Sequence, residues 1–136
     1  MPVEADVVAY LAAAGLGLAA GTDLFEGPAP ETPDNVVAVS LYATERSDDY
    51  TMGASLSAPG SELEHIQVMT RHAVKATAKS RADSIHAVLD NLQTTTTVNS
   101  RTYFEIASDG PPFGMGQDPN LRWRYAANYR VRKPRG

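Results

Sequence analysis

The alternation of apolar and polar side chains is clearest over residues 121–133. One side of the alternation carries Trp123, Tyr125, Ala127, Tyr129 and Val131. The other side carries Arg122, Arg124, Ala126, Asn128, Arg130 and Arg132. A period of two with aromatic and β-branched residues predicts a strand. We expect its aromatic side to face the core and its arginine side to meet something anionic.

Two segments have the spacing of amphipathic helices. A short helix is predicted over residues 4–14, with acidic residues in its first turn, where the helix dipole favours anions. A longer helix is predicted over residues 73–92, which gives about 30 Å of helix. Its apolar stripe comprises Val74, Ala78, Ala82, Ile85, Leu89 and Leu92. A helix of that length can cover a whole sheet.

Further strands are predicted at four places where β-branched and aromatic residues gather: 22–26, 35–43, 62–70 and 101–107. The resulting order of elements favours an α+β fold. We expect a mostly antiparallel sheet of four or five strands, with the long helix packed on one face and the short N-terminal helix beside it. The length of 136 residues predicts a single domain over residues 1–136.

Three stretches are predicted to lack regular structure. Residues 44–61 have no usable periodicity, and a connection of this length in a small domain is usually functional or disordered. We expect it to be mobile in the free subunit and to become ordered against a neighbour. Residues 93–100 are predicted to be a polar turn. Residues 110–118, rich in glycine and with a double proline, are predicted to be a loop that is neither helix nor strand.

Charge is divided unevenly along the chain. Residues 1–64 carry eleven acids and one base, whereas residues 65–136 carry eleven bases and five acids. This division either neutralises itself within the domain or creates two faces of opposite sign, which suits head-to-tail association of identical copies. The apolar run at residues 7–20 is too short for a membrane span, and no cysteine is present. We therefore expect a soluble, intracellular protein that does not enter a membrane.

Residues with catalytic or metal-binding chemistry do not form a recognised pattern. His65, His72 and His86 make no metal-ligand pair with one another or with an acid. Asp48 and Asp49 are better explained as a solvated acidic tip than as a cation site. We therefore expect no enzyme activity, no catalytic residues, no metal and no cofactor.

The arginine side of residues 121–133 leaves three explanations open. It can contact DNA phosphates, be neutralised by acids of the same domain, or form ion pairs with another subunit. We favour the third, because arginine grips carboxylates bidentately and the N-terminal half supplies many acids.

The order of several short segments resembles the tail terminators and minor tail or minor capsid proteins of long-tailed bacteriophages. The segments are PDNVVAVSLY at 33–42, IQVMTR at 66–71, VLDNL at 88–92, YFEI at 103–106, PPFGMGQD at 111–118 and RYAANYRV at 124–131. Each segment alone is unspecific, and the match lies in their order and spacing over most of the chain.

The resemblance implies a structural virion protein at the head–tail interface, assembled in the host cytoplasm. It implies a hexameric ring that caps the tail tube and joins it to the head connector, with genomic DNA passing through without specific binding. The interface residues we expect are Arg122, Arg124, Arg130, Arg132, Asp48 and Asp49. The alternatives are another head–tail joining ring, such as an adaptor or stopper, and a small nucleic-acid-binding module that uses the arginine side.

Overall fold

The computed structural model describes residues 3–31, 34–47, 61–90, 96–98, 101–103 and 105–134. Two helices, α1 (Val3–Ala13) and α2 (Lys75–Asp90), are combined with strands. The strands are β1 (Leu24–Glu26), β2 (Val36–Ser47), β3 (Ser61–His72), β4 (Thr96–Val98), β5 (Arg101–Tyr103), β6 (Glu105–Ser108), β7 (Phe113–Gln117) and β8 (Trp123–Pro134). The expected α+β class is confirmed.

The main sheet has six strands in the order β1-β2-β3-β8-β6, and β7 also pairs with β8. Strands β6 and β7 share one edge of β8, because β6 pairs with its second half and β7 with its first half. Among the described strands, β1 alone runs parallel to its neighbour, so the prediction of a mostly antiparallel sheet is confirmed. The small hairpin of β4 and β5 forms a separate two-stranded sheet.

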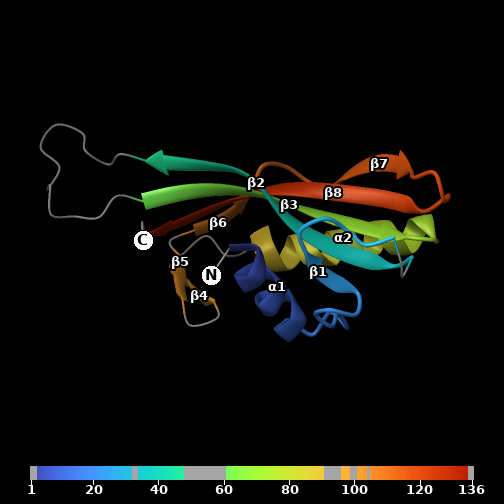
Figure 1. Ribbon diagram of the computed structural model, residues 1–136, viewed down its shortest axis with the longest axis horizontal. Helices are drawn as coiled ribbons and strands as arrows, with labels where there is room; N and C mark the ends of the chain where they lie inside the picture. Colours follow the sequence, from blue (N-terminus) through green and yellow to red (C-terminus); the bar gives the residue numbers. More distant parts are fainter. Residues whose placement is uncertain are drawn as a thin grey trace, which may run out of the picture.

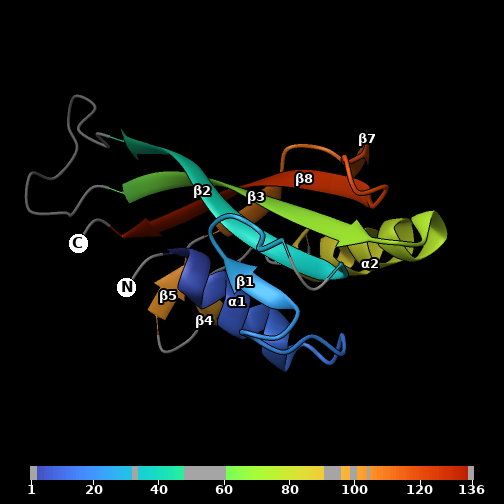
Figure 2. The same cartoon turned by 45° about the vertical axis from the view of Figure 1, so that its right-hand side comes forward.

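Both helices lie on the same side of the main sheet, as Figures 1 and 2 show. Helix α2 contacts β3, β6 and β8, whereas α1 contacts β1 and β2. Neither helix in the described part of the chain is long and apolar enough to span a bilayer. Neither of the described helices lies on the opposite side of the sheet, which we call the open face.

The core lies between the sheet and the two helices. Strand register places Val39, Val68 and Ala127 in one row across the three long strands, and all three are buried. Tyr129, in the next inward-facing row, is the largest fully buried side chain. The apolar side predicted for residues 121–133 therefore faces the core, as expected from its alternation.

The short helix begins and ends one residue before its predicted range of 4–14, and the long helix is four residues shorter than the predicted twenty. The middle of the predicted stripe is buried and confirmed: Ala78, Ala82, Ile85 and Leu89. Val74 is 53% exposed, so its assignment to the stripe was wrong. It precedes the helix, and its N–H donates to His72 Nδ1 at 2.9 Å, which turns the chain out of β3. Leu92 lies outside the described residues.

The long connection predicted over residues 44–61 is shorter in the structure. Strand β2 continues to Ser47 and β3 begins at Ser61, and these two residues face each other in the register. The prediction was wrong at both ends because pairing of β3 with β2 and β8 extends the strands through polar sequence that shows no alternation. Asp48 and Asp49 lie outside the described residues.

The prediction of a loop over residues 110–118 was also wrong, because β7 forms there. The two prolines precede the strand and therefore remove no hydrogen bond from it. Gly116 has a φ of 77° at the irregularity where β7 bulges against β8. Glycine tolerates this geometry, so the residues that argued against a strand instead fit a bulged edge strand.

Two other predicted ranges differ in detail. The strand expected at 101–107 is divided into β5 and β6, and Phe104 between them lies outside the described residues. The polar turn expected at 93–100 contains β4, which pairs with β5. Both differences come from pairing between strands. The sequence of a short polar segment does not by itself indicate such pairing.

Candidate assembly surfaces

The open face carries a row of polar side chains across the three long strands. Gln67 and Asn128 are register partners, and Gln67 Nε2 donates to Asn128 Oδ1 at 3.2 Å. In the next row, the ring of His65 lies 5.8 Å from the ring of Tyr42. Partial burial, and secondarily the carboxylate of Asp109, raise the pKa of Tyr42. This part of the open face combines neutral hydrogen-bonding groups with charged ones, because Arg130 is the register partner of His65.

Arg122 lies just before β8 and is buried, with 4% of its surface exposed. Its guanidinium forms ion pairs with Asp118 at 2.7 Å, Glu31 at 3.1 Å and Asp34 at 3.4 Å. It also donates to the Glu31 carbonyl at 2.6 Å. Arg122 is therefore neutralised by acids of its own chain, the second of the three explanations that the sequence left open for the arginine side.

Asp118 is the other half of this cluster. Its Oδ1 accepts the N–H groups of Asn120 and Arg122, at 3.0 and 2.9 Å. Burial opposes ionisation of Asp118, but the hydrogen bonds and charge of Arg122, together with the Asn120 N–H, outweigh it and lower the pKa of this carboxyl. The turn between β7 and β8 is thereby held in one conformation.

Arg71 holds the segment between β1 and β2 against the end of the sheet. Its Nε donates to the Asp34 carbonyl at 3.1 Å and its Nη2 to the Pro30 carbonyl at 2.6 Å. Burial, and then the neighbouring Arg122, lower the pKa of Arg71. Arg71 and Arg122 together connect this proline-rich segment to β3 and to the start of β8, so both buried arginines serve the fold.

The remaining predicted arginines share the open face of β8 but have different surroundings. Arg130 pairs with Asp109 at 2.7 Å and stays half exposed. Arg124 donates to the Met115 carbonyl at 3.3 Å, has no carboxylate partner in the described part of the chain, and has a buried Nε without an acceptor. Arg132 is half-buried and faces Leu63 and Glu105 in the register. The structure thus places Arg124, Arg130 and Arg132 on one face of β8, with Arg124 six residues from Arg130 along the strand, and turns Arg122 into an ion-pair cluster of its own. Asp48 and Asp49 lie outside the described residues.

One chain of polar side chains beneath α2 could suggest catalysis. His86 Nδ1 lies 3.1 Å from the Tyr129 hydroxyl, and Ser108 Oγ donates to Asp90 Oδ1 at 2.8 Å. The order is unsuited to nucleophilic catalysis, because the serine contacts the carboxylate rather than the histidine. Burial strongly raises the pKa of Tyr129, so this hydroxyl stays neutral. The arrangement is explained by satisfaction of polar groups under the helix.

Exposed apolar side chains gather around the β7–β8 hairpin, and the sequence-based prediction missed them. Phe113 and Met115 on β7 are 46% and 38% exposed, and Leu121 in the turn is 69% exposed. Leu121 also has a φ of 62°, a left-handed conformation that non-glycine residues rarely adopt. The alternation Phe-Gly-Met-Gly was the available signal, but the glycines concealed it. We call Phe113, Met115 and Leu121 the hairpin patch.

A hollow of about 400 Å³ lies between α1 and β1 at the other edge of the sheet. Its lining is mostly apolar, with one charged residue, Glu26: Ala5, Val8, Ala9, Ala20, Gly21, Leu24, Phe25 and Glu26. We call it the edge groove. Glu26 is exposed and has no ion-pair partner among the residues that the structure describes. The groove offers an apolar recess with a carboxylate at its rim.

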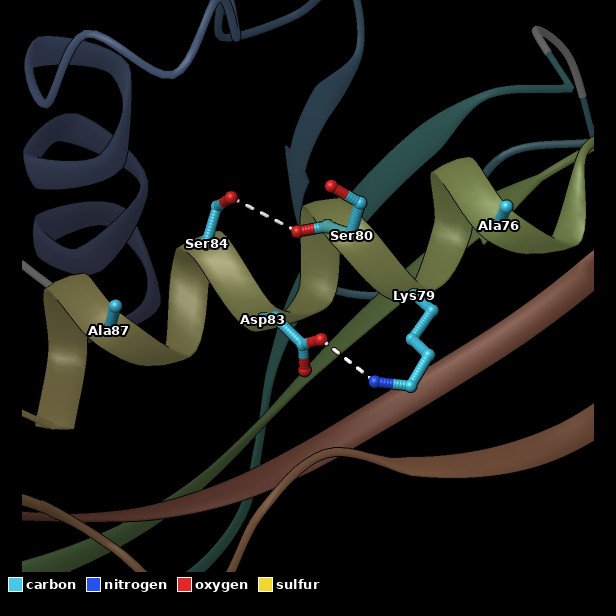
Figure 3. Close-up of a pocket in the computed structure, with 6 residues that line it drawn as sticks. All are labelled: Ala76, Lys79, Ser80, Asp83, Ser84 and Ala87. Carbon is cyan, nitrogen blue, oxygen red and sulfur yellow. Dashed lines mark hydrogen bonds and ion pairs between the residues drawn. The ribbon is translucent and has the colours of Figure 1, made fainter.

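A second hollow, of about 510 Å³, runs along the outward surface of α2 (Figure 3). The residues that line it have small side chains, except for Lys79 and Asp83, which form an exposed ion pair at 2.9 Å. Ser84 donates to the Ser80 carbonyl at 3.0 Å, so its hydroxyl is occupied by the helix itself. Within the described residues, no group of three histidine, aspartate or glutamate side chains is placed to hold a metal ion.

Comparison with known proteins identifies the family. The model of a family described as bacteriophage tail terminator protein matches residues 10–134. A solved structure described as the virion of a native gene transfer agent particle is 17% identical, with a TM-score of 0.64 over 98% of this chain and 95% of that one. Another solved structure is 11% identical, covering 95% of this chain and 89% of the other, but its TM-score of 0.46 is too low to establish a shared fold. A comparison with curated proteins gave no match.

Proposed function

Because the chain belongs to the bacteriophage tail terminator family, we propose that it forms a closed ring of six copies that caps the finished tail tube and joins it to the head connector. Family membership makes it a structural tail protein of the virion. The observation that carries the proposal is the family match over residues 10–134. The ring, its size and its position at the head–tail interface belong to the proposal.

The open face supplies the charged contacts in this proposal. We assign Arg124, Arg130 and Arg132, together with Asp48 and Asp49, to the charged contacts that subunits form with one another or with neighbouring tail proteins. Arg124 supports this assignment, because its guanidinium lacks a carboxylate within the described residues. Arg122 contributes indirectly, since its pairs with Asp118 and Glu31 hold the turn that begins β8.

The proposal is tested by reversing charges on the open face. Replacing both Arg124 and Arg130 with glutamate should block the joining of tails to heads, because two cations in the proposed contacts become anions. The measurement is the fraction of joined particles in electron micrographs when the variant complements a deletion of the gene. Circular dichroism of the purified variant verifies that it is folded.

Lys79→Glu is the matched control, since Lys79 is exposed on α2, away from the open face. This variant should join tails normally. Normal joining by the Arg124→Glu/Arg130→Glu variant would contradict the assigned interface. A deletion of the gene that leaves tail length and joining unchanged would contradict the proposed function itself.

A further inference from the structure

The two edges of the main sheet carry complementary features that cannot meet within one copy. The edge groove lies beside β1, and the hairpin patch lies on and beyond β7. Strands β1 and β7 are at opposite ends of the strand order, as Figure 2 shows. The hairpin patch and the edge groove are both apolar and lie on opposite edges, which favours head-to-tail contact between identical copies.

The turn that carries Leu121 of the hairpin patch is held by hydrogen bonds and projects into solvent. The turn before β8 is fixed by the Asp118 carboxylate, by Leu121 N–H donating to the Asp118 carbonyl at 3.0 Å, and by Gln117 donating to the Leu121 carbonyl at 3.2 Å. These bonds hold Leu121 in its left-handed conformation with most of its side chain in solvent. Strain and apolar exposure at one rigidly held residue indicate a contact that the isolated subunit does not make.

Charge around the two surfaces is also complementary. Arg124 lies beside the patch, with its guanidinium on the Met115 carbonyl and no carboxylate partner in the described part of the chain. Glu26, at the rim of the edge groove, has no cationic partner among the described residues. Contact between copies would pair Arg124 of one copy with Glu26 of the next. It would also bury the apolar side chains of the hairpin patch and the edge groove.

Strand register places Phe113 of the hairpin patch at the level of Phe25 in the edge groove. One row of register partners runs from Phe25 on β1 through Ala38, Met69 and Ala126 to Phe113 on β7. The pairing directions also make β7 antiparallel to β1. Copies placed side by side therefore bring β7 of one beside β1 of the next in opposite directions. Arg124 lies in the row of Val36 and Glu26 in the row of Val39, so a shift of three residues along the strands brings the two charges level.

We propose that the edge groove receives the hairpin patch of a second copy of this chain, with Leu121 entering the groove and Arg124 of one copy facing Glu26 of the next. The inference rests on the proposed ring and names the surfaces that would close it. It assigns a role to three features that the open face does not use: the strained Leu121, the exposed strand β7 and the hollow beside α1.

The absence of native cysteine allows a direct test by cross-linking. A variant carrying both Ala9→Cys and Leu121→Cys places one thiol in the edge groove and one in the hairpin patch. In assembled particles treated with a short bismaleimide, this variant should give a ladder of covalent oligomers that ends at the ring size. Each single-cysteine variant should give at least about tenfold less cross-linked product, because a head-to-tail contact pairs unlike positions.

The control variant combines Leu121→Cys with Ser84→Cys on the outward surface of α2, and it should give no ladder. Purified particles are also probed for the amount of the protein that they contain. Absence of the ladder in particles with a normal amount of the protein overturns the docking and leaves the terminator function intact. Absence of the protein from particles that join normally would instead overturn the proposed function.

A charge exchange gives a second, independent readout. Glu26→Arg and Arg124→Glu should each lower the yield of joined particles by about tenfold or more, and the double variant should restore most of it. Failure of the double variant to recover, although it is folded and reaches wild-type levels, would contradict the facing of Arg124 and Glu26.

Discussion

At the scale of single residues, the buried polar groups show how the ends of elements are fixed. His72 ends β3, and its Nδ1 accepts the N–H of Val74 at 2.9 Å just before α2 begins. Burial, and secondarily the nearby Arg81, lower the pKa of His72 below its ordinary value of 6.5. The neutral ring is therefore the form that the folded chain favours, because a proton on Nδ1 would remove the acceptor.

We predict that this residue makes the protein less stable as the pH falls. The unfolded chain takes up a proton at His72 near pH 6.5, before the folded chain does, so the contribution is fully present above that value and is lost as pH falls through the lower folded pKa. Urea unfolding at several pH values measures the slope. His72→Asn keeps an acceptor without a titrating ring and should flatten the slope, whereas equal slopes for variant and wild type would contradict the prediction.

Leu121 gives a second residue-scale prediction, in which a substitution leaves the stability of the subunit unchanged or raises it. Asparagine tolerates the left-handed conformation better than leucine, whose strain there is on the order of 1–2 kcal/mol. Since Leu121 is 69% exposed, little packing is lost on replacement. Leu121→Asn should therefore leave the free energy of unfolding unchanged or raise it by less than about 1 kcal/mol. A loss of more than about 1 kcal/mol in urea titration would mean that Leu121 supports the subunit's own fold.

At the scale of elements, patterns with a strong period predicted the structure well. The alternation over 121–133 became β8, and the middle of the apolar stripe over 73–92 became the buried side of α2. Strand β7 was not predictable in the same way, because its five residues include two glycines and it pairs only along the edge of β8. Its strand conformation depends on a partner distant in the sequence, which local propensity does not reveal.

Two residues of the predicted stripe, one buried and one exposed, provide an element-scale prediction. Leu89 is fully buried between α2 and the sheet, whereas Val74 lies outside the helix and is mostly exposed. Leu89→Ala should lower the free energy of unfolding by about 2–5 kcal/mol through lost burial and a cavity. Val74→Ala should change it by no more than about 0.5 kcal/mol. Comparable losses for both variants in denaturant titrations would show that the helix packs along its whole predicted stripe.

At the scale of the whole molecule, the arginine side illustrates what a sequence can and cannot give. Its shared face was predictable from period two, and Arg124, Arg130 and Arg132 do lie on the open face of β8. The pairing of Arg122 with Glu31 was not predictable, because the two residues are 91 positions apart and meet only through the fold. Neutralisation by the chain's own acids therefore decides how much positive charge the surface retains.

That retained charge sets our last prediction, which concerns DNA. Arg122 is buried among three carboxylates and Arg130 is paired with Asp109, so the four arginines do not form a continuous cationic surface. Affinity for DNA depends on how many phosphates are neutralised, and each contact contributes through release of counterions. We expect the isolated protein to bind duplex DNA with a Kd no tighter than about 10 µM near 150 mM salt, in the range of non-specific binding.

Fluorescence anisotropy with a labelled duplex measures this affinity, and the Asp109→Asn variant, which frees Arg130, should bind more tightly than the wild type. Wild-type binding well below 1 µM, lost in the Arg124→Glu/Arg130→Glu variant, would favour a nucleic-acid-binding module over a ring through which DNA slides.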